Sequence, residues 1–348
     1  MKKLNRVLVL LLLAVPLALL LASVYAPAPQ AGPTPAKPIV IKASHGYPAG
    51  KYVLNLIHLK FEELTEKYTD GRVQVDVYPT AQLFPAREEI EACARGDIQF
   101  ISTPNAFSSA YQPWYVIMDI PFLFKDFGHF ARFMAHPKVA KLHRESWKAK
   151  GLKVFPFVKL EMLYCLWTKD RPLTKMEDFQ GLKFRALHGV HPFLKAWGAS
   201  GMLIEAAEIP TAVGTGMVDG VQLTPDFVAR TKLYTKLRHG PPEGTYFISS
   251  GGADLLMPLK FWNSLPKDIQ DIIENKVIPE VLAFGKTQSG EAAKEAYKVF
   301  RGEGMQFAWF SDAEIGRMKA VAAPLVKDML KKGGALDLLP IARETEKP

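Results

Sequence analysis

Between residues 39 and 104 the spacing of apolar residues switches between the period of a strand and that of a helix, and this alternation constrains the fold most. The predicted elements are a strand at 39–45, a helix over about 52–68, a turn and a second strand within 70–79, and a short helix followed by a third strand within 86–103. Strands that alternate with helices form parallel sheets, because each helix returns the chain to the same end of the sheet. We therefore predict an α/β fold.

Parallel α/β sheets bind ligands at the carboxyl ends of their strands, where loops meet the first turns of helices. In this chain the loops that follow the first and third predicted strands span 45–50 and 102–105. The candidate binding residues in these loops are His45, Tyr47, Ser102, Thr103 and Asn105.

A second strand, helix, strand pattern follows between residues 180 and 227, as if a second lobe repeated the first. Its first strand reads "QGLKFRALHG", with Leu182 and Phe184 on one side and Lys183 and Arg185 on the other. Most arginines on a strand face are solvated. Arg185, however, comes late on the strand, where a guanidinium can hold a carboxylate through two parallel hydrogen bonds. The pattern alone leaves both roles open.

The remaining segments complete an α/β chain. Residues 151–170 predict a strand pair or one long bent strand, and residues 265–304 predict a long helical region that Pro279 should kink or interrupt. A final helix is predicted over about 312–332.

The first 26 residues have the features of a cleavable secretory signal peptide: Lys2, Lys3 and Arg6 precede an apolar run, and small residues follow it. An uncleaved membrane anchor is the alternative, although the run is short for a span. The Pro- and Ala-rich stretch 27–38 predicts an extended tether. We therefore expect export to the periplasm.

Charge and cysteine content narrow the function further. The formal net charge of +9 is spread along the chain without a basic run or a basic face interleaved with aromatics, which argues against a nucleic-acid partner. The two cysteines, Cys93 and Cys165, lie in apolar patterns and are predicted to be buried and unlinked.

Enzyme and metal motifs are incomplete. The segment 214–220 has one residue too many for a dinucleotide fingerprint, and His188 with His191 lack a third zinc ligand. Ser264 and Lys267 have the spacing of a nucleophile pair, but Pro266 makes a helix start capped by Ser264 the simpler interpretation.

Ordered pieces of the chain resemble the solute-binding proteins of tripartite ATP-independent periplasmic (TRAP) transporters, the DctP-type family. They are a segment at 43–100, then "IPFLF", "EDFQGLKFR", "EIPTAV", "GMVDG" and "FWNSLPKDIQ". The resemblance covers nearly the whole chain after the leader.

The resemblance implies a binder rather than an enzyme, which closes around a small organic acid and delivers it to the large and small membrane subunits of a permease. The implied fold is two-lobed, each lobe a mixed, mostly parallel sheet flanked by helices, with a long helical segment linking the lobes. We expect lobe I at 39–162 plus 250–289, and lobe II at 163–249 plus 290–348.

The resemblance also assigns roles to particular residues. The arginine that grips a carboxylate in the family ends a motif like "GLKFR", so that role falls on Arg185. We expect the other ligand contacts from His45, Tyr47, Ser102, Thr103, Asn105, Glu161, Tyr164, Trp167, Gln222 and Thr224.

The chain departs from the family pattern at two places. A second arginine found upstream in many members is replaced by Cys165, and a glutamate-tryptophan pair that can help bind a cation is replaced by Gln222 and Leu223. We therefore predict no metal and no cofactor. An exported sensory receptor, or a hydrolase or lyase on a similar scaffold, remains the alternative function.

Overall fold

Two β-sheets organise the chain in the computed structural model, which describes residues 37–159, 164–245 and 252–347. The first sheet has the strand order β2-β1-β3-β11-β4, and β5 also pairs with β11. Its strands are β1 (Ile39–Ser44), β2 (Val73–Tyr78), β3 (Phe100–Pro104), β4 (Leu152–Val154), β5 (Val158–Lys159) and β11 (Gly252–Pro258).

The first part of this sheet is parallel, as the alternation of strands and helices predicts. β1 pairs in parallel with β2 on one side and with β3 on the other. The connecting helices are α2 (Val53–Tyr68) and α3 (Glu89–Arg95). The apolar residues of α2 at helical spacing, including Leu54, Ile57 and Phe61, are all buried against the sheet.

The second sheet has the order β12-β10-β6-β9-β7-β8. Its strands are β6 (Cys165–Thr168), β7 (Lys183–Arg185), β8 (Ser200–Met202), β9 (Gly220–Leu223), β10 (His239–Gly240) and β12 (Gln306–Phe307). β7 pairs in parallel with both β8 and β9, whereas β6 is antiparallel to β9.

The two sheets share one arrangement. Each has three parallel strands with the first strand in the middle, β2-β1-β3 and β8-β7-β9, and an antiparallel fourth strand beside the third, β11 or β6. The predicted segment 151–170 contributes β4 and β5 to the first sheet and β6 to the second, so it connects the two sheets. The fold is therefore the two-lobed α/β arrangement that the sequence predicts.

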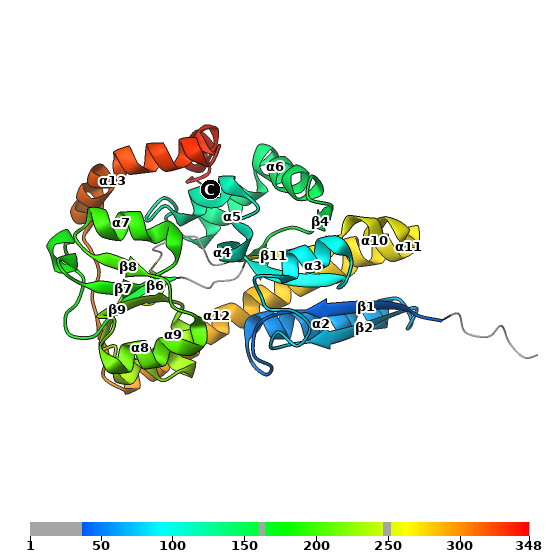
Figure 1. Ribbon diagram of the computed structural model, residues 1–348, viewed down its shortest axis with the longest axis horizontal. Helices are drawn as coiled ribbons and strands as arrows, with labels where there is room; N and C mark the ends of the chain where they lie inside the picture. The colour runs from blue at the N-terminus through cyan, green and yellow to red at the C-terminus, as the bar shows by residue number, and fades with distance from the viewer. Residues whose placement is uncertain (1–36, 160–163, 246–251, 348) are drawn as a thin grey trace, which may run out of the picture. The chain divides into compact units, whose positions relative to one another are not determined.

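A long helical path runs past both sheets (Figure 1). It consists of α11 (Lys267–Ile272), the π-helical turn η6 (Ile273–Val277) and α12 (Ile278–Gly302), and α12 packs against both α2 and α9 (Pro225–Arg230). Pro279 does not interrupt the path, because it occupies the first turn of α12 directly after the π-turn.

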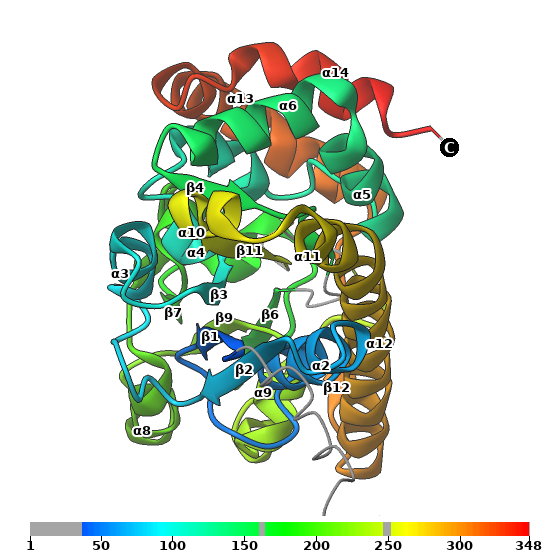
Figure 2. The same cartoon turned by 90° about the vertical axis from the view of Figure 1, so that its right-hand side faces the viewer.

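The other helices cover the sheets. They are α4 (Asn105–Ser108), η1 (Pro113–Asp119), α5 (Phe127–Ala135), α6 (Pro137–Lys148), η2 (Met176–Phe179), η3 (His188–Val190), α7 (His191–Ala196), η4 (Ala206–Glu208), α8 (Ile209–Thr215), η5 (Leu233–Thr235), α10 (Leu259–Ser264), α13 (Asp312–Lys332), η7 (Leu336–Leu338) and α14 (Leu339–Glu344). Figure 2 shows α5, α6, α13 and α14 gathered at one end of the view.

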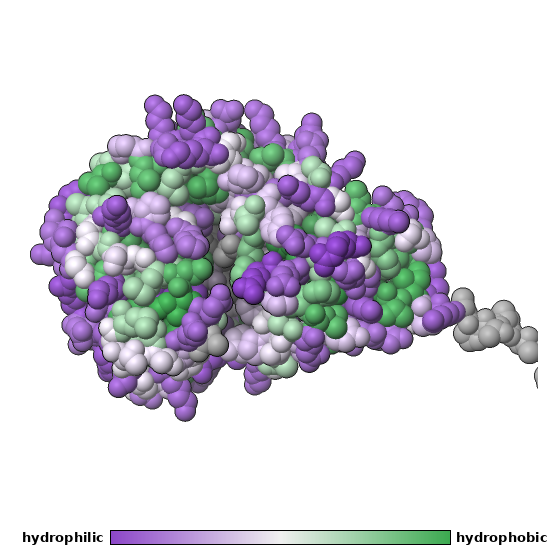
Figure 3. Space-filling view, in the orientation of Figure 1, coloured by the Kyte–Doolittle hydropathy of each residue, from purple (hydrophilic) through white to green (hydrophobic). Residues whose placement is uncertain are grey.

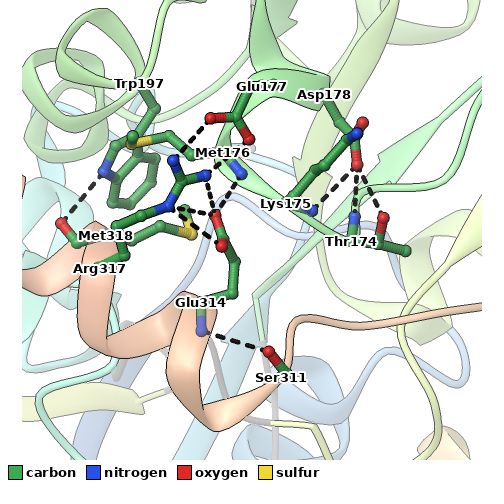
Figure 4. A network of polar contacts seen from close by, with 10 residues as sticks. All are labelled: Thr174, Lys175, Met176, Glu177, Asp178, Trp197, Ser311, Glu314, Arg317 and Met318. Carbon is green, nitrogen blue, oxygen red and sulfur yellow. Dashed lines mark hydrogen bonds and ion pairs between the residues drawn. The ribbon is translucent and has the colours of Figure 1, made fainter.

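An ion-pair network fixes α13, whose bounds match the prediction, to the segment before β7 (Figure 4). Arg317 donates from both terminal nitrogens to the carboxylate of Glu177, each at 2.6 Å, and also contacts Glu314. Glu314 in turn accepts from the backbone N–H of Met176 at 2.6 Å. The chain's last long helix is thereby tied to the turn η2, which precedes β7.

The cores lie under these elements, and hydrophilic residues predominate on the face drawn in Figure 3. One core joins aromatic residues of η1 and α5 with residues of β6, β7, α7 and α13. Cys93 and Cys165 are buried and unlinked, as predicted. Among the described residues no helix is long and apolar enough to cross a membrane. The predicted signal peptide and most of the tether, residues 1–36, lie outside the described residues.

Candidate functional site

The candidate site consists of residues at corresponding strand ends of the two sheets. Arg185 is the last residue of β7, and Thr224 follows the last residue of β9. In the first sheet, His45 follows β1 and Asn105 follows β3. In each sheet these strands are parallel neighbours, so their carboxyl ends lie along one edge.

The guanidinium of Arg185 is buried at this edge. Its Nε donates to the carbonyl oxygen of Ile204 at 3.2 Å, and Nη1 donates to the carbonyl oxygen of Gln222 at 3.1 Å. Both carbonyls belong to the chain at or just beyond the ends of neighbouring strands. Only 7% of Arg185 is exposed, whereas Lys183, on the same side of β7, is exposed.

Arg185 has no carboxylate partner within ion-pair distance among the residues that the structure describes. Burial lowers its pKa, while the nearby Tyr164 and Glu205 oppose that shift. Removing a guanidinium from water without a counter-ion is costly, so buried charges are normally paired. The site therefore holds a positive charge that backbone carbonyls orient and that no carboxylate of the described residues pairs with.

Gln222 supports the arginine and offers a donor of its own. Its side-chain Oε1 accepts from the backbone N–H of Leu187 at 2.9 Å, which fixes the orientation of the amide. Its Nε2 is buried and has no hydrogen-bond partner among the residues that the structure describes. A buried N–H without a partner is uncommon in folded proteins and indicates a group that is satisfied by something else.

The loop after β1 is held by its own histidine. Nδ1 of His45 accepts from the backbone N–H of Tyr47 at 3.2 Å, so Nε2 carries the proton and donates to Oδ1 of Asn55 at 3.2 Å. Burial lowers the pKa of His45 to about 4, which keeps the ring neutral. Both ring nitrogens are thus used within the protein, and His45 shapes the loop instead of offering a free hydrogen-bonding group.

Sequence reasoning did not select Glu89, Asn55 or His58, which complete this buried polar cluster. Glu89 accepts from the hydroxyl of Ser44 at 2.7 Å, and burial raises its pKa to about 7 although bonds from Ser44 and the backbone of Gly46 oppose the rise. His58 lies 4.5 Å from His45 between ring centroids. The available signal was the two polar residues of α2, three positions apart, on the face of the helix that packs on the sheet.

Tyrosine side chains link the strand ends of the two sheets electrostatically. Burial raises the pKa of Tyr47, and the proximity of Tyr164, Glu89 and Asp226 adds to that rise. The pKa of Tyr164 is also raised by burial, and it is affected by Arg185 and Asp226. Tyr47, from the loop after β1, therefore lies near enough to Tyr164 to influence its surroundings electrostatically, as Tyr164 does for Arg185.

Other predicted contacts lie in different surroundings. Ser102 bonds to Nε2 of His58 at 2.9 Å, and Asn105 donates to the sulfur of Met118 at 3.7 Å. Thr103 is buried with its hydroxyl unpartnered, and Thr224 is buried just after β9. Glu161 lies outside the described residues.

Trp167 is a core residue. Its indole ring is fully buried, packs on Phe300 with 5.2 Å between centroids, and donates to the carbonyl oxygen of Leu223. We therefore leave Trp167 out of the binding site proposed below.

The histidine and serine motifs of the sequence include side chains that bond to backbone carbonyl oxygens. In the described parts of the chain no group of three or more His, Cys, Asp or Glu side chains could hold a metal ion. His191 bonds to the carbonyl oxygen of Ala186. The predicted capping role of Ser264 is wrong: its hydroxyl bonds back to Phe261 at the end of α10, and Pro266 precedes the next helix.

Comparisons with known proteins agree with this geometry. Residues 43–333 match the model of the family described as bacterial extracellular solute-binding protein, family 7. A C4-dicarboxylate-binding periplasmic protein, DctP, from Rhodobacter capsulatus is 28% identical over 311 residues, which cover 87% of this chain and 90% of that protein.

Solved structures show the same fold. A TRAP periplasmic solute-binding protein from Shewanella oneidensis, solved with bound succinate, is 26% identical, with a TM-score of 0.77 over 89% of this chain and all of that one. The sugar acid-binding protein DctPAm from Advenella mimigardefordensis, solved with galactonate, is 21% identical with a TM-score of 0.76, over 89% of this chain and 99% of that one. These relatives bind solutes, and none of them is described as an enzyme. The chain belongs to family 7 of the bacterial extracellular solute-binding proteins, the DctP-type proteins of TRAP transporters.

Proposed function

We propose that this periplasmic solute-binding protein captures a small organic acid by pairing the ligand's carboxylate with Arg185, and then delivers the acid to the membrane subunits of its transporter. The observation that carries the proposal is the buried guanidinium, which two backbone carbonyls orient and no carboxylate of the described residues neutralises.

Arg185 keeps N–H donors after its two hydrogen bonds to backbone carbonyl oxygens. Nε and Nη1 each make one bond to a carbonyl, which leaves N–H groups of the fork for a second acceptor. A carboxylate accepts two parallel N–H bonds from such a fork and supplies the missing negative charge. A carboxylate ligand therefore compensates the desolvation of Arg185 and is held in one orientation.

Binding by hinge closure accounts for the arrangement of the two sheets. We propose that residues 39–162 with 250–289 and residues 163–249 with 290–348 act as the two lobes. Tyr47, which follows β1, and Tyr164, which precedes β6, then approach the ligand from opposite lobes. The contribution of each lobe to the closed form sets how far the ligand shifts the equilibrium between open and closed states.

The names of relatives support an acid as the ligand class. The Rhodobacter capsulatus relative is named for C4-dicarboxylates, and the Shewanella oneidensis structure contains succinate. Both ligands are small carboxylates, which fits the chemistry of Arg185.

A thermal-shift screen and calorimetry test the proposal. We expect some members of a panel of mono- and dicarboxylates, keto acids, aromatic acids and sugar acids to raise Tm, because a ligand at a hundred times its Kd adds about 2.7 kcal/mol. For the acid that binds, Arg185→Ala should weaken affinity by about 2–5 kcal/mol, since the acid loses its buried partner. Arg185→Lys should also weaken binding, because the fork is lost.

Lys183→Ala is the matched control, since Lys183 lies on the same side of β7 but is exposed. It should leave affinity within about twofold of the wild type, which corresponds to roughly 0.4 kcal/mol. A panel in which no acid raises Tm, or an Arg185→Ala variant with unchanged affinity, would overturn the proposal.

A further inference from the structure

We infer that the ligand carries one carboxylate only, and that its far end is an uncharged group bearing a hydroxyl or carbonyl oxygen. This inference rests on the proposed pairing with Arg185 and adds the class of acid. It separates this chain from relatives that are named for C4-dicarboxylates.

A second carboxylate would need a second positive group near Arg185, and two cations near these strand ends, Arg230 and Lys169, already have protein partners. Arg230 forms an ion pair with Asp226 and donates to the carbonyl oxygen of Lys51. Lys169 donates to the carbonyl oxygen of Val213 at 3.0 Å.

The undescribed segments inside the chain add no cation. Residues 160–163 and 246–251 contain no Lys, Arg or His. Beyond the predicted signal peptide, Lys159 is the one cation whose side chain is not described, so a Lys159 variant is part of the test.

The two buried histidines of the first sheet region, His45 and His58, stay neutral. Nδ1 of His45 accepts a backbone N–H, and a protonated ring could not accept it. His58 is fully buried, and its ring lies 4.5 Å from that of His45. Burial lowers the pKa of both rings, and the proximity of His45 lowers that of His58 further. Neither imidazole provides the charge that a second carboxylate would require.

Acidic residues near Arg185 disfavour a second carboxylate on the ligand. Glu205 lies close enough to Arg185 to influence its pKa, and Asp226 does so for both Tyr47 and Tyr164. Arg230 offsets the charge of Asp226, but Glu205 has no ion-pair partner among the described residues. A second ionised carboxylate near Arg185 would therefore also experience the negative charge of Glu205, and like charges repel.

The site offers neutral hydrogen-bond donors for the far end of the ligand. The phenol groups of Tyr47 and Tyr164 make no hydrogen bond to the described residues, and their raised pKa values keep both protonated. Nε2 of Gln222 is a further buried donor without a partner. Uncharged O–H and N–H groups pair well with ligand hydroxyl and carbonyl oxygens. Cys165, beside Tyr164, adds no charge: its thiol is buried and donates to the carbonyl oxygen of Thr245.

Calorimetry on matched acids tests the inference. The pairs are 4-hydroxybutyrate and succinate, gluconate and glucarate, and 4-(hydroxymethyl)benzoate and terephthalate, all at pH 7.5 and fixed ionic strength. In each pair one hydroxymethyl group replaces one carboxylate. We expect the monoacid of at least one pair to bind at least tenfold more tightly than its diacid. A diacid that binds as tightly or more tightly overturns the inference and leaves the proposed function standing.

Variants give the second readout. Tyr47→Phe and Tyr164→Phe should weaken 4-hydroxybutyrate or gluconate severalfold but leave the unsubstituted butyrate unchanged, because only the hydroxyl contact is lost. Equal effects on both acids would contradict the role of the phenols. Lys159→Gln should not change the preference for the monoacid; if it does, Lys159 is the second cation and the inference is wrong. If none of the six acids binds, the inference is overturned, whereas the broader acid screen and Arg185→Ala still decide the proposed function.

Discussion

Arg230 donates from Nη2 to the backbone carbonyl oxygen of Lys51 at 2.7 Å, although the two residues are 179 positions apart in the chain. Its guanidinium also lies over the ring of Tyr52, 5.0 Å from the centroid. Lys51 and Tyr52 belong to the loop between β1 and α2, and Arg230 ends α9, which follows β9. This contact therefore joins the segment that follows β1 of the first sheet to the helix that follows β9 of the second sheet.

We predict that Arg230→Ala speeds ligand release. If the lobes separate when the ligand leaves, this contact must break, so its loss destabilises the closed form. A partly exposed, charge-assisted hydrogen bond contributes about 0.5–1.5 kcal/mol, which corresponds to a roughly 2- to 12-fold weaker affinity. Stopped-flow fluorescence should show the change mainly in the dissociation rate.

Arg72→Ala is the control for Arg230→Ala. Arg72 pairs with Asp268 at 2.7 Å, also across a long sequence separation, but both side chains are more than half exposed and join elements of the first sheet region. Its loss should leave the dissociation rate unchanged. Equal rates for wild type and Arg230→Ala would show that the bridge to Lys51 has no part in closure.

The pH dependence of stability should report on Glu89. Burial raises its pKa from 4.5 to about 7, so between these values the folded state binds a proton that the unfolded chain does not. The stability contributed at this residue is therefore complete below pH 4.5 and is lost as pH rises to 7, by at most about 1.4 kcal/mol per pH unit. Urea unfolding at several pH values should show wild type losing stability relative to Glu89→Gln over this window.

The histidines act in the opposite direction. The lowered pKa of His45, about 4 against 6.5, makes stability rise with pH between these two values. The wild-type profile thus combines two opposing slopes, and the rise from His45 should be steeper in Glu89→Gln, where the opposing slope is absent. A difference between wild type and Glu89→Gln that does not vary from pH 4.5 to 7 would contradict the burial of an ionisable Glu89.

Periodicity predicted those elements that keep one face apolar. α2 and β1 begin and end within one residue of the predicted bounds, because their buried and exposed positions follow the helical and strand periods clearly. β11 was not predicted: all seven of its residues are buried, so a central strand shows no alternation. Its partners β3 and β4 come from distant parts of the chain, which local patterns do not reveal.

The sequence could predict where the site lies but not the surroundings of its side chains. Strand ends can be located from sequence, which drew attention to Arg185 and to the loop at His45. The environment of a side chain depends on neighbours far along the chain. Arg185 is buried because Ile204 and Gln222 supply carbonyls, and Glu89 reaches Ser44 from 45 positions away. Trp167, which was expected to supply an apolar wall of the site, is fully buried in a core, where Tyr297 and Phe300 of α12 pack against it.

Gly220→Ala should disturb β9, the strand whose Gln222 carbonyl oxygen orients Arg185. A Cβ at Gly220 would lie 2.4 Å from Cε1 of Phe184 and 2.7 Å from the carbonyl oxygen of Trp167, so the backbone must shift. We expect a loss of about 1–3 kcal/mol in the free energy of unfolding and a weaker affinity for the acid. Gly214→Ala, in the neighbouring helix α8 with open space around it, should be neutral or stabilising by up to about 1 kcal/mol. Similar Tm values for the two variants would contradict the close contact.

Asp254→Ala should destabilise the fold more than the substitution of either of its hydrogen-bond partners does. Asp254 is fully buried in β11, where it accepts from the hydroxyl of Tyr115 at 2.8 Å and contacts Nε2 of His143 at 2.7 Å. Its removal leaves both buried groups unpaired, at a cost of about 3–5 kcal/mol, whereas Tyr115→Phe should cost about 1–2 kcal/mol. The double variant Tyr115→Phe/Asp254→Ala should lose less stability than the sum of the losses of the two single variants. Once the phenol hydroxyl is absent, the loss of its acceptor no longer leaves it unpaired. Strict additivity in urea unfolding would show that Tyr115 and Asp254 are not coupled.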